Sequence, residues 1–296
     1  MIKVGVDIGG TFTDIVLADL GKGIVSVSKV PTTPDDFSSG VMTGIKRILK
    51  QTGHRSPDID QIIHATTIVT NSIIEGKVAK SGFITTKGFK DILEIQRQIR
   101  TELYDFFHVR PRPLVPRYLC YEVSERIGPE GDVLKDLDED DVISAARDLM
   151  EKKVESIAVC LLHSYMNPAH ERRIGEIIKE KYPAAYVSLS SEVCPHFREY
   201  FRASTTVVNA VTIPIADRYI RNLENKLKEE VFTAGLYIMQ SSGGIMTSER
   251  AIKEPVYMVE SGPAAGTIVA KFMGEILGWE NIISFDMGGP PRRHLC

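Results

Sequence analysis

The sequence predicts an α/β fold, because short apolar runs alternate with segments of helical periodicity along most of its length. Hydrophobic residues make up 43% of the 296 residues and charged residues 25%, which is typical of a globular protein with a sizeable core. The formal net charge of −3 gives no general attraction to nucleic acid or to an anionic membrane. No apolar run approaches the roughly 20 residues that a membrane helix needs. We therefore expect neither nucleic acid nor a membrane as a partner.

The first predicted strand begins at residue 2, which leaves no room for a signal peptide. The four cysteines stand far apart and form no CxxC pair, so neither a disulfide framework nor a zinc site is expected. These features indicate a cytoplasmic protein.

The amino-terminal part predicts mostly strands. Apolar runs bounded by turn residues predict strands over residues 2–8, 12–19, 23–31 and 59–67, and a strand with its turn over 80–89. Apolar residues at helical spacing predict helices over residues 33–53 and 67–76.

From about residue 91 to 138 the pattern loosens, and we interpret this range as an insertion packed on the main fold, with a hairpin over 124–138. Beyond it, helices are predicted over 138–153, 167–182, 199–230 and 260–278, and strands over 154–162, 185–193, 236–244 and 281–289. Pro214 predicts a kink or a break in the long helical region. The predicted organisation is an amino-terminal region over 1–200, a helical region with a connecting helix over 201–281, and the first strand of a further domain with an atypical tail over 282–296.

The stretch DIGGTFTD after the first strand is a candidate phosphate-binding hairpin. Gly9 and Gly10 let the backbone turn tightly and approach a bulky anion without a Cβ in the way. Their N–H groups, with the hydroxyls of Thr11 and Thr13, can donate to phosphate oxygens. Asp7, at the carboxyl end of the strand, is placed to hold a Mg²⁺ ion through water. A plain hairpin turn between two strands is the alternative interpretation.

The same plan recurs near the end of the chain in ISFDMGGP. Asp286 corresponds to Asp7, and Gly288 and Gly289 correspond to the two glycines of the first hairpin. Two such hairpins can grip the phosphates of a nucleotide from both sides of a cleft, which favours a phosphate site over a plain turn.

The paired hairpins resemble the actin-like ATPase superfamily, whose two duplicated domains each open with such a hairpin. This resemblance implies a first actin-like (ribonuclease H-like) domain with an inserted region, and a second domain that is essentially missing. The closer resemblance is to the A-type subunit of the hydantoinase/5-oxoprolinase family, which N-methylhydantoinases, oxoprolinases and acetone carboxylases share. It is carried, in order, by VGVDIGGTFTDIVL, HATTIVTNSIIEGK, GFITTKGFKDILEIQRQ, LLHSYMNPAHE, SSEVCPHFREYFRASTTVVNAV, MQSSGGIM and ESGPAAG.

The resemblance implies an ATP-dependent hydrolase that acts on a small cyclic amide or a related carbonyl substrate. The γ-phosphate of ATP would pass to the amide or carbonyl oxygen, and water or another nucleophile would complete ring opening or carboxylation. ATP and Mg²⁺ are the implied cofactors and a B-type subunit the implied partner, while a homo-oligomer stays open. Asp7 and Asp286 would be the catalytic and Mg²⁺-binding residues. The hairpin residues would hold the phosphates: Gly9, Gly10, Thr11, Thr13, Gly288 and Gly289.

Two polar clusters are candidates for the substrate side of the cleft. His64, Thr67 and Asn71 follow one another in HATTIVTN, where the alternative is a helix start capped by a threonine. Arg198, with Arg202 four residues later, suits carboxylate recognition, although a solvated helix face with ion pairs is the alternative.

The residues after Gly289, PPRRHLC, do not continue the phosphate motif. Pro290 and Pro291 remove two N–H donors where the hairpin needs them. We interpret the chain as an A-type subunit cut short, and expect weak ATP binding and no turnover from the chain alone. Two other hypotheses stay open: a small-molecule kinase of the same superfamily, and a non-catalytic remnant that binds a partner subunit.

Overall fold

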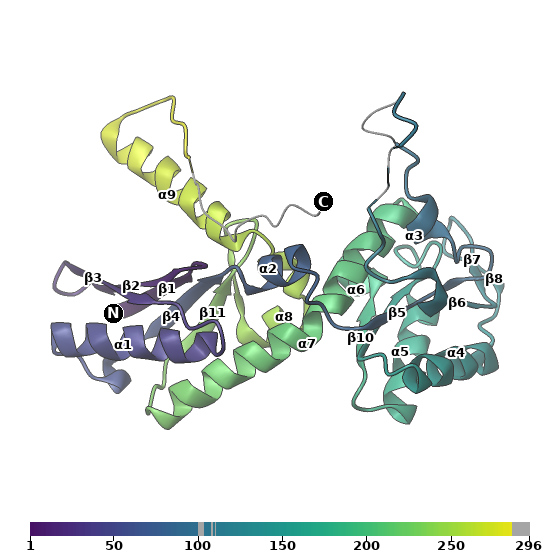
Figure 1. Cartoon of the computed structure of the whole chain (residues 1–296), viewed down its shortest axis with the longest axis horizontal. Helices are drawn as coiled ribbons and strands as arrows, with labels where there is room; N and C mark the ends of the chain where they lie inside the picture. Colours follow the sequence, from purple (N-terminus) through teal and green to yellow (C-terminus); the bar gives the residue numbers. More distant parts are fainter. Residues whose placement is uncertain (100–103, 108, 110, 286–296) are drawn as a thin grey trace. The chain divides into compact units, whose positions relative to one another are not determined.

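The computed structural model describes residues 1–99, 104–107, 109 and 111–285 (Figure 1). The chain forms two compact units. The first unit comprises Met1–Lys77 and Ile215–Cys296, and the second comprises Val78–Pro214. The second unit is therefore inserted in the sequence between two parts of the first.

The first unit is built on a six-stranded sheet with the strand order β12-β11-β4-β1-β2-β3. Its strands are β1 (Ile2–Ile8), β2 (Phe12–Asp19), β3 (Ile24–Pro31), β4 (Gln61–Thr66), β11 (Gly235–Met239) and β12 (Ile245–Thr247). β1, β2 and β3 form an antiparallel meander, and β12 runs antiparallel to β11. β4 runs parallel to both β1 and β11, so the carboxyl ends of these three strands meet at one edge of the sheet.

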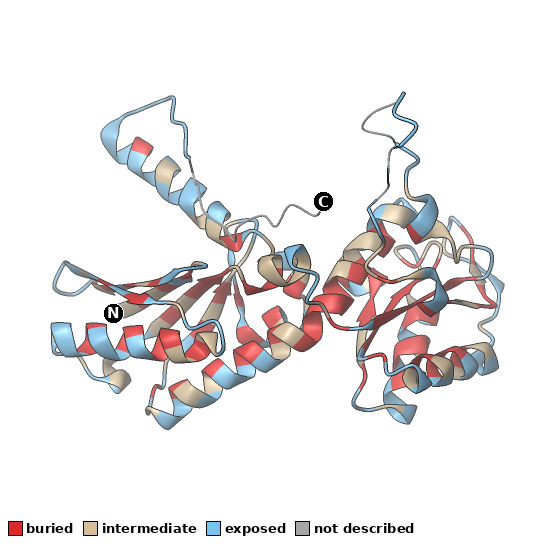
Figure 2. Ribbon diagram, in the orientation of Figure 1, coloured by how far each residue is buried: buried red, intermediate tan, exposed pale blue. Residues whose placement is uncertain are grey.

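Helices cover one face of this sheet and cap its ends. They are α1 (Phe37–Thr52), α2 (Ile68–Ile74), α8 (Ser248–Lys253), α9 (Ser261–Leu277) and the second half of α7 (Glu199–Glu229), with short 3-10 turns η1 (Ser56–Asp58) and η3 (Pro255–Met258). α1 and α7 turn their buried sides toward the sheet (Figure 2). Val4, Val6 and Ile8 of β1 face this core, and Asp7 is exposed because side chains alternate along a strand.

The second unit is built on a parallel four-stranded sheet with the order β10-β9-β5-β6 and has its own hydrophobic core. Its strands are β5 (Ser81–Thr86), β6 (Cys120–Val123), β9 (Ser156–Cys160) and β10 (Tyr186–Leu189). Around the sheet are α3 (Ile92–Ile95), α4 (Glu139–Glu151), α5 (Ala169–Lys181), α6 (Ser190–Val193), the first half of α7, the turn η2 (Arg117–Leu119) and the hairpin of β7 (Arg126–Ile127) and β8 (Val133–Lys135). No helix in the described ranges of either unit is long and apolar enough to cross a membrane.

Helix α7 runs without interruption through Pro214, so the alternative of a break at this residue is wrong. Proline has no N–H, and the carbonyl of Ala210 therefore receives no helical hydrogen bond from position 214. The Ser156 hydroxyl donates to this carbonyl instead, at 2.7 Å. The carbonyl of Val211 accepts a hydrogen bond from the Ala79 N–H at 3.0 Å. Donors from outside the helix thus satisfy the carbonyls next to the proline.

Two other parts of the predicted organisation need correction. The range 91–138 contains β6, which pairs with β5 in the sheet of the second unit. The insertion is therefore larger than predicted, because the whole of Val78–Pro214 interrupts the first unit. The strand predicted over 281–289 is absent from its described part, since residues 281–285 have no regular secondary structure. A strand needs a neighbour for its backbone groups, and none of the described strands pairs with this segment.

The predicted ranges 1–200, 201–281 and 282–296 were defined by sequence motifs, whereas the two units are defined by how the chain packs. The division into these three ranges stays a prediction.

Candidate functional site

The turn between β1 and β2 places two backbone amides at the surface. The Gly9 N–H donates to the Phe12 carbonyl at 2.9 Å, and a Cβ on Gly9 would lie only 3.1 Å from the same oxygen. Glycine therefore permits this close turn. Gly10 and Thr11 are exposed, and within the described ranges no protein acceptor is bonded to their N–H groups. These two amides are available to donate to a bound anion.

Thr32, immediately after β3, fixes this hairpin from behind. Its hydroxyl donates to the Gly9 carbonyl at 2.9 Å, and its N–H donates to the Thr11 carbonyl at 2.9 Å. The hydroxyl of Thr13 lies 3.1 Å from that of Thr32, and Thr13 is completely buried. The prediction that Thr13 holds phosphate is therefore wrong, because the alternation of β2 turns this side chain into the core. Thr13 and Thr32 instead support the backbone that carries the exposed amides.

Asp7 stands directly opposite Asp14 in the register of β1 and β2. Carboxylates in such a pair repel each other. Lys29, opposite Asp14 on β3, approaches the Asp14 carboxylate to 3.2 Å. Mg²⁺ accepts a single carboxylate together with water and phosphate oxygens, so the exposed Asp7 fits this ion. Elsewhere in the described ranges, no three His, Cys, Asp or Glu side chains gather as a metal site.

The amino terminus of α9 lies beside the same aspartate. A Cβ built on Gly262 would lie 3.9 Å from Asp7 Oδ1 and 3.8 Å from Thr67 Cγ2. The Ser261 hydroxyl donates to the Thr66 carbonyl at 3.2 Å, which attaches the start of the helix to the end of β4. The N–H groups and positive dipole end of a helix attract anions. The start of α9 thus brings a second set of donors to the edge that carries the hairpin.

Thr67 and Asn71 also lie at this edge. The Thr67 hydroxyl donates to the Ile8 carbonyl at 3.2 Å, and the Asn71 amide donates to the Thr67 hydroxyl at 3.2 Å. Both side chains are partly buried. They connect the end of β1 to the start of α2, and their contact with a substrate stays a prediction.

His64 is completely buried, so the prediction that it contacts a substrate is wrong. Its Nδ1 lies 3.4 Å from the Val6 carbonyl, which can only accept, so Nδ1 carries the proton. Its Nε2 then accepts a hydrogen bond from the Tyr219 hydroxyl at 2.7 Å. Burial lowers the pKa of His64 to about 4, which keeps the ring neutral at pH 7. His64 is a core residue that connects β1 and β4 to α7.

The other predicted site residues have no contact with this edge that the structure describes. Arg198 is exposed and belongs to the second unit, and its contact with a substrate stays a prediction. Asp286, Gly288 and Gly289 lie outside the described residues.

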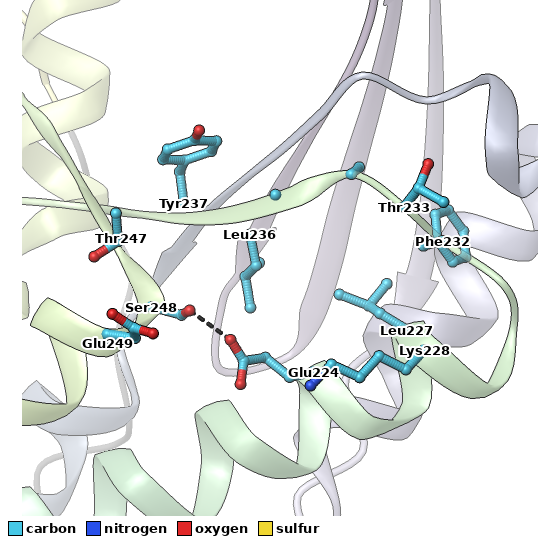
Figure 3. Close-up of a pocket in the computed structure, with 12 residues that line it drawn as sticks. Glu224, Leu227, Lys228, Phe232, Thr233, Leu236, Tyr237, Thr247, Ser248 and Glu249 are labelled. Carbon is cyan, nitrogen blue, oxygen red and sulfur yellow. Dashed lines mark hydrogen bonds between the residues drawn. The ribbon is translucent and has the colours of Figure 1, made fainter.

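A cavity of about 420 Å³ lies at the opposite end of the sheet (Figure 3). It is lined by the amino-terminal half of β11, the end of α7 and the start of α8, where the Ser248 hydroxyl donates to Glu224. Ligands of α/β sheets bind at the carboxyl ends of the strands. We therefore assign the site to the edge with the hairpin and not to this cavity.

The fold is thus an α/β fold with a glycine hairpin and a helix amino terminus at the carboxyl edge of a sheet. A family model described as the hydantoinase/oxoprolinase N-terminal region matches residues 3–182, and one described as hydantoinase/oxoprolinase matches residues 202–290. The chain belongs to the hydantoinase/oxoprolinase family, and two solved structures that match it, a caprolactamase and an acetone carboxylase, are described as ATP-dependent.

Three comparisons give the extent of the likeness. An uncharacterized protein of Methanocaldococcus jannaschii is 41% identical over 97% of this chain and 42% of its own length. The caprolactamase subunit alpha of Pseudomonas jessenii is 34% identical with the same coverage, and the crystal structure of the ATP-dependent caprolactamase matches with a TM-score of 0.87 at 33% identity, over 97% of this chain and 42% of that one. The nucleotide-free structure of an ATP-dependent acetone carboxylase matches with a TM-score of 0.84 at 29% identity, over 93% of this chain and 41% of that one. The chain therefore spans about 42% of the length of these relatives.

Proposed function

We propose that this chain forms the phosphate-binding part of an ATP-dependent enzyme that opens a cyclic amide. One observation carries the proposal: the exposed amides of Gly10 and Thr11, the carboxylate of Asp7 and the start of α9 occupy one sheet edge. The family membership supports it, since the name of the Pseudomonas relative states that it acts on a lactam with ATP. The relatives are named as subunits, and we propose a B-type subunit as the partner.

In this proposal the protein holds the phosphates in position and places donors and charges beside them. The amides of Gly10 and Thr11 donate to phosphate oxygens, and the amino terminus of α9 adds further donors and a positive dipole end. Asp7 orients Mg²⁺, which when bound neutralises charge on the phosphates.

The chemistry follows from these positions. The bond between the β,γ-bridging oxygen and the γ-phosphorus of ATP breaks as the amide oxygen of the substrate bonds to that phosphorus. Water then adds to the amide carbon, the carbon–nitrogen bond of the ring breaks as the nitrogen takes up a proton, and the carbonyl carbon keeps the phosphate as an acyl phosphate. A second water hydrolyses this acyl phosphate to the carboxylic acid and releases inorganic phosphate. Ketone carboxylation by related enzymes can begin with the same phosphoryl step, so the proposed site would suit either outcome.

The test is ATP-dependent turnover by the protein purified from its own host with its partners. Hydantoin, 5-oxoproline and caprolactam are supplied in turn, and ADP and the ring-opened product are both quantified. We expect Asp7→Asn to lower turnover by about 100-fold or more, since it removes a charge at the transferring phosphate. Asp14→Asn is the matched control, because it makes the same change across the same hairpin. Phosphorylated product without ring opening would replace this proposal with a kinase, and no ATP consumption with any substrate would leave a non-catalytic protein.

A further inference from the structure

The cavity at the opposite end of the sheet from the hairpin has no part in the proposed phosphate site (Figure 3). Its volume of about 420 Å³ lies within the range of small-molecule sites. Its floor is apolar, because Leu227, Phe232 and Leu236 line it and are only 4–8% exposed. In Figure 3, Leu236 points from β11 toward Leu227 on α7. The floor can therefore contact the apolar part of a ligand.

Two carboxylates lie beside this apolar floor. Glu224 comes from α7 and Glu249 from the start of α8. The Ser248 hydroxyl donates to Glu224 Oε1, and no described residue donates to the second oxygen, Oε2. Within the described ranges neither carboxylate forms an ion pair, whereas Arg250 next to them is paired with Glu254 at 2.9 Å. One side of the cavity is therefore negatively charged and has acceptors that are not yet used.

Lys228 is the only cation among the described residues that line the cavity. It is exposed, and it follows Glu224 by one helical turn on α7. Its ammonium forms no ion pair with either carboxylate of the lining in the part of the chain that the structure describes. Two carboxylates against one ammonium give the lining a formal charge of −1. This charge favours a cationic ligand over an anionic one.

We propose that this cavity binds a small organic cation, namely a primary ammonium attached to an apolar chain. The ammonium donates to Glu224 Oε2 and to the Glu249 carboxylate, and hydrogen bonds between two charged groups are among the strongest in proteins. The apolar chain lies on Leu227, Phe232 and Leu236. The opening of a cyclic amide releases an amine of this class. Only this last connection rests on the proposed function, whereas the binding itself does not.

The test is a nuclear magnetic resonance titration of the ¹⁵N-labelled full chain with hexylammonium chloride, in the absence of ATP. Hexanoate and hexanol have the same chain length and serve as the anionic and the neutral control. We expect saturable shifts of the Leu236, Tyr237 and Ser248 amide signals with hexylammonium, and an affinity lower by about tenfold or more for both controls. Equal affinities for the three compounds, or signals that stay in place with hexylammonium, would overturn the proposal.

Variants of the charged residues test the assignment in opposite directions. Glu224→Gln keeps an acceptor for Ser248 and should lower the affinity for hexylammonium about tenfold. Lys228→Gln removes a like charge and should raise this affinity about two- to fivefold. Glu229→Gln is the matched control, because this exposed residue of the same helix lies outside the lining of the cavity. Equal affinities in Glu224→Gln and Glu229→Gln would contradict the proposal.

One further variant separates this site from the phosphate site. Asp7→Asn should leave the binding of hexylammonium unchanged, since this residue lies at the other end of its sheet. A loss of turnover in Asp7→Asn therefore tests the proposed function alone. Shifts of the hairpin amides in place of those at the cavity would show that the cation binds at the other edge, and would overturn the proposal.

Discussion

Replacing Ser156 with alanine should destabilise the second unit, because it leaves one buried backbone carbonyl without a hydrogen-bond donor. The Ser156 hydroxyl donates at 2.7 Å to the carbonyl of Ala210, which has no helical donor because residue 214 is proline. Ser156 is completely buried, so bulk water cannot take its place. Its other partner, Ser81, keeps a hydrogen bond to the Ala79 carbonyl at 3.0 Å. The cost is therefore that of one unsatisfied buried acceptor, about 1–3 kcal/mol.

Pro214→Ala supplies the internal control, because an alanine at this position returns the missing N–H to the helix. In that background Ser156→Ala should lose most of its cost, which gives a coupling free energy of about 1–3 kcal/mol in the double-mutant cycle. The four proteins are compared by urea unfolding followed by circular dichroism. If Ser156→Ala costs the same with proline and with alanine at position 214, the explanation through the Ala210 carbonyl is refuted.

Three further predictions concern the first unit. Burial lowers the pKa of His64 to about 4, below its ordinary 6.5. The neutral ring therefore makes its full contribution to the free energy of unfolding above pH 6.5, and this contribution is lost as the pH falls toward 4. The loss should be about 2 kcal/mol at pH 5 in urea unfolding, and an equal loss in His64→Gln would contradict this cause. Thr32→Val removes the donor to the Gly9 carbonyl and should lower the free energy of unfolding by about 0.5–1.5 kcal/mol, measured by thermal unfolding. Thr32→Ser keeps a hydroxyl and should lower it less. Equal losses in the two variants would show that the hydroxyl does not stabilise the hairpin. Gly44→Ala would place a Cβ 2.0 Å from Cδ1 of Ile15, and this overlap should destabilise the protein by about 1–3 kcal/mol. The better helix propensity of alanine offsets up to about 1 kcal/mol of that cost. A stabilised variant would show that the core can rearrange at this point.

Much of the hairpin could be predicted from the sequence, because its information is local. Two glycines between two runs of alternating apolar residues define the turn. Asp7 is exposed because it alternates along the strand with the buried Val6 and Ile8. The same alternation could have placed Thr13 inside, since it shares its face of β2 with Ile15 and Leu17. The hydroxyl next to a glycine turn indicated a phosphate ligand, whereas the periodicity of the strand indicated a buried side chain.

The rest depends on contacts between distant residues. Thr32 meets Gly9 from 23 residues away, and Tyr219 meets His64 from 155 residues away, so no local pattern marks either pair. The start of α9 had a local signal in the stretch SGP, which is typical of a helix amino terminus, yet its approach to Asp7 follows only from the sheet order. A strand such as that predicted over 281–289 needs a neighbour as well as a pattern.

The most direct test of the central claim is a nuclear magnetic resonance titration of the ¹⁵N-labelled full chain with MgATP. The method detects weak binding at individual amides. We predict saturable shifts of the Gly10, Thr11 and Gly262 signals. The affinity for MgATP should fall about tenfold or more in Asp7→Asn and change little in Asp14→Asn. Hairpin signals that stay in place at millimolar MgATP, or that move equally in the Asp7→Asn protein, would contradict the assignment of this edge as the phosphate site.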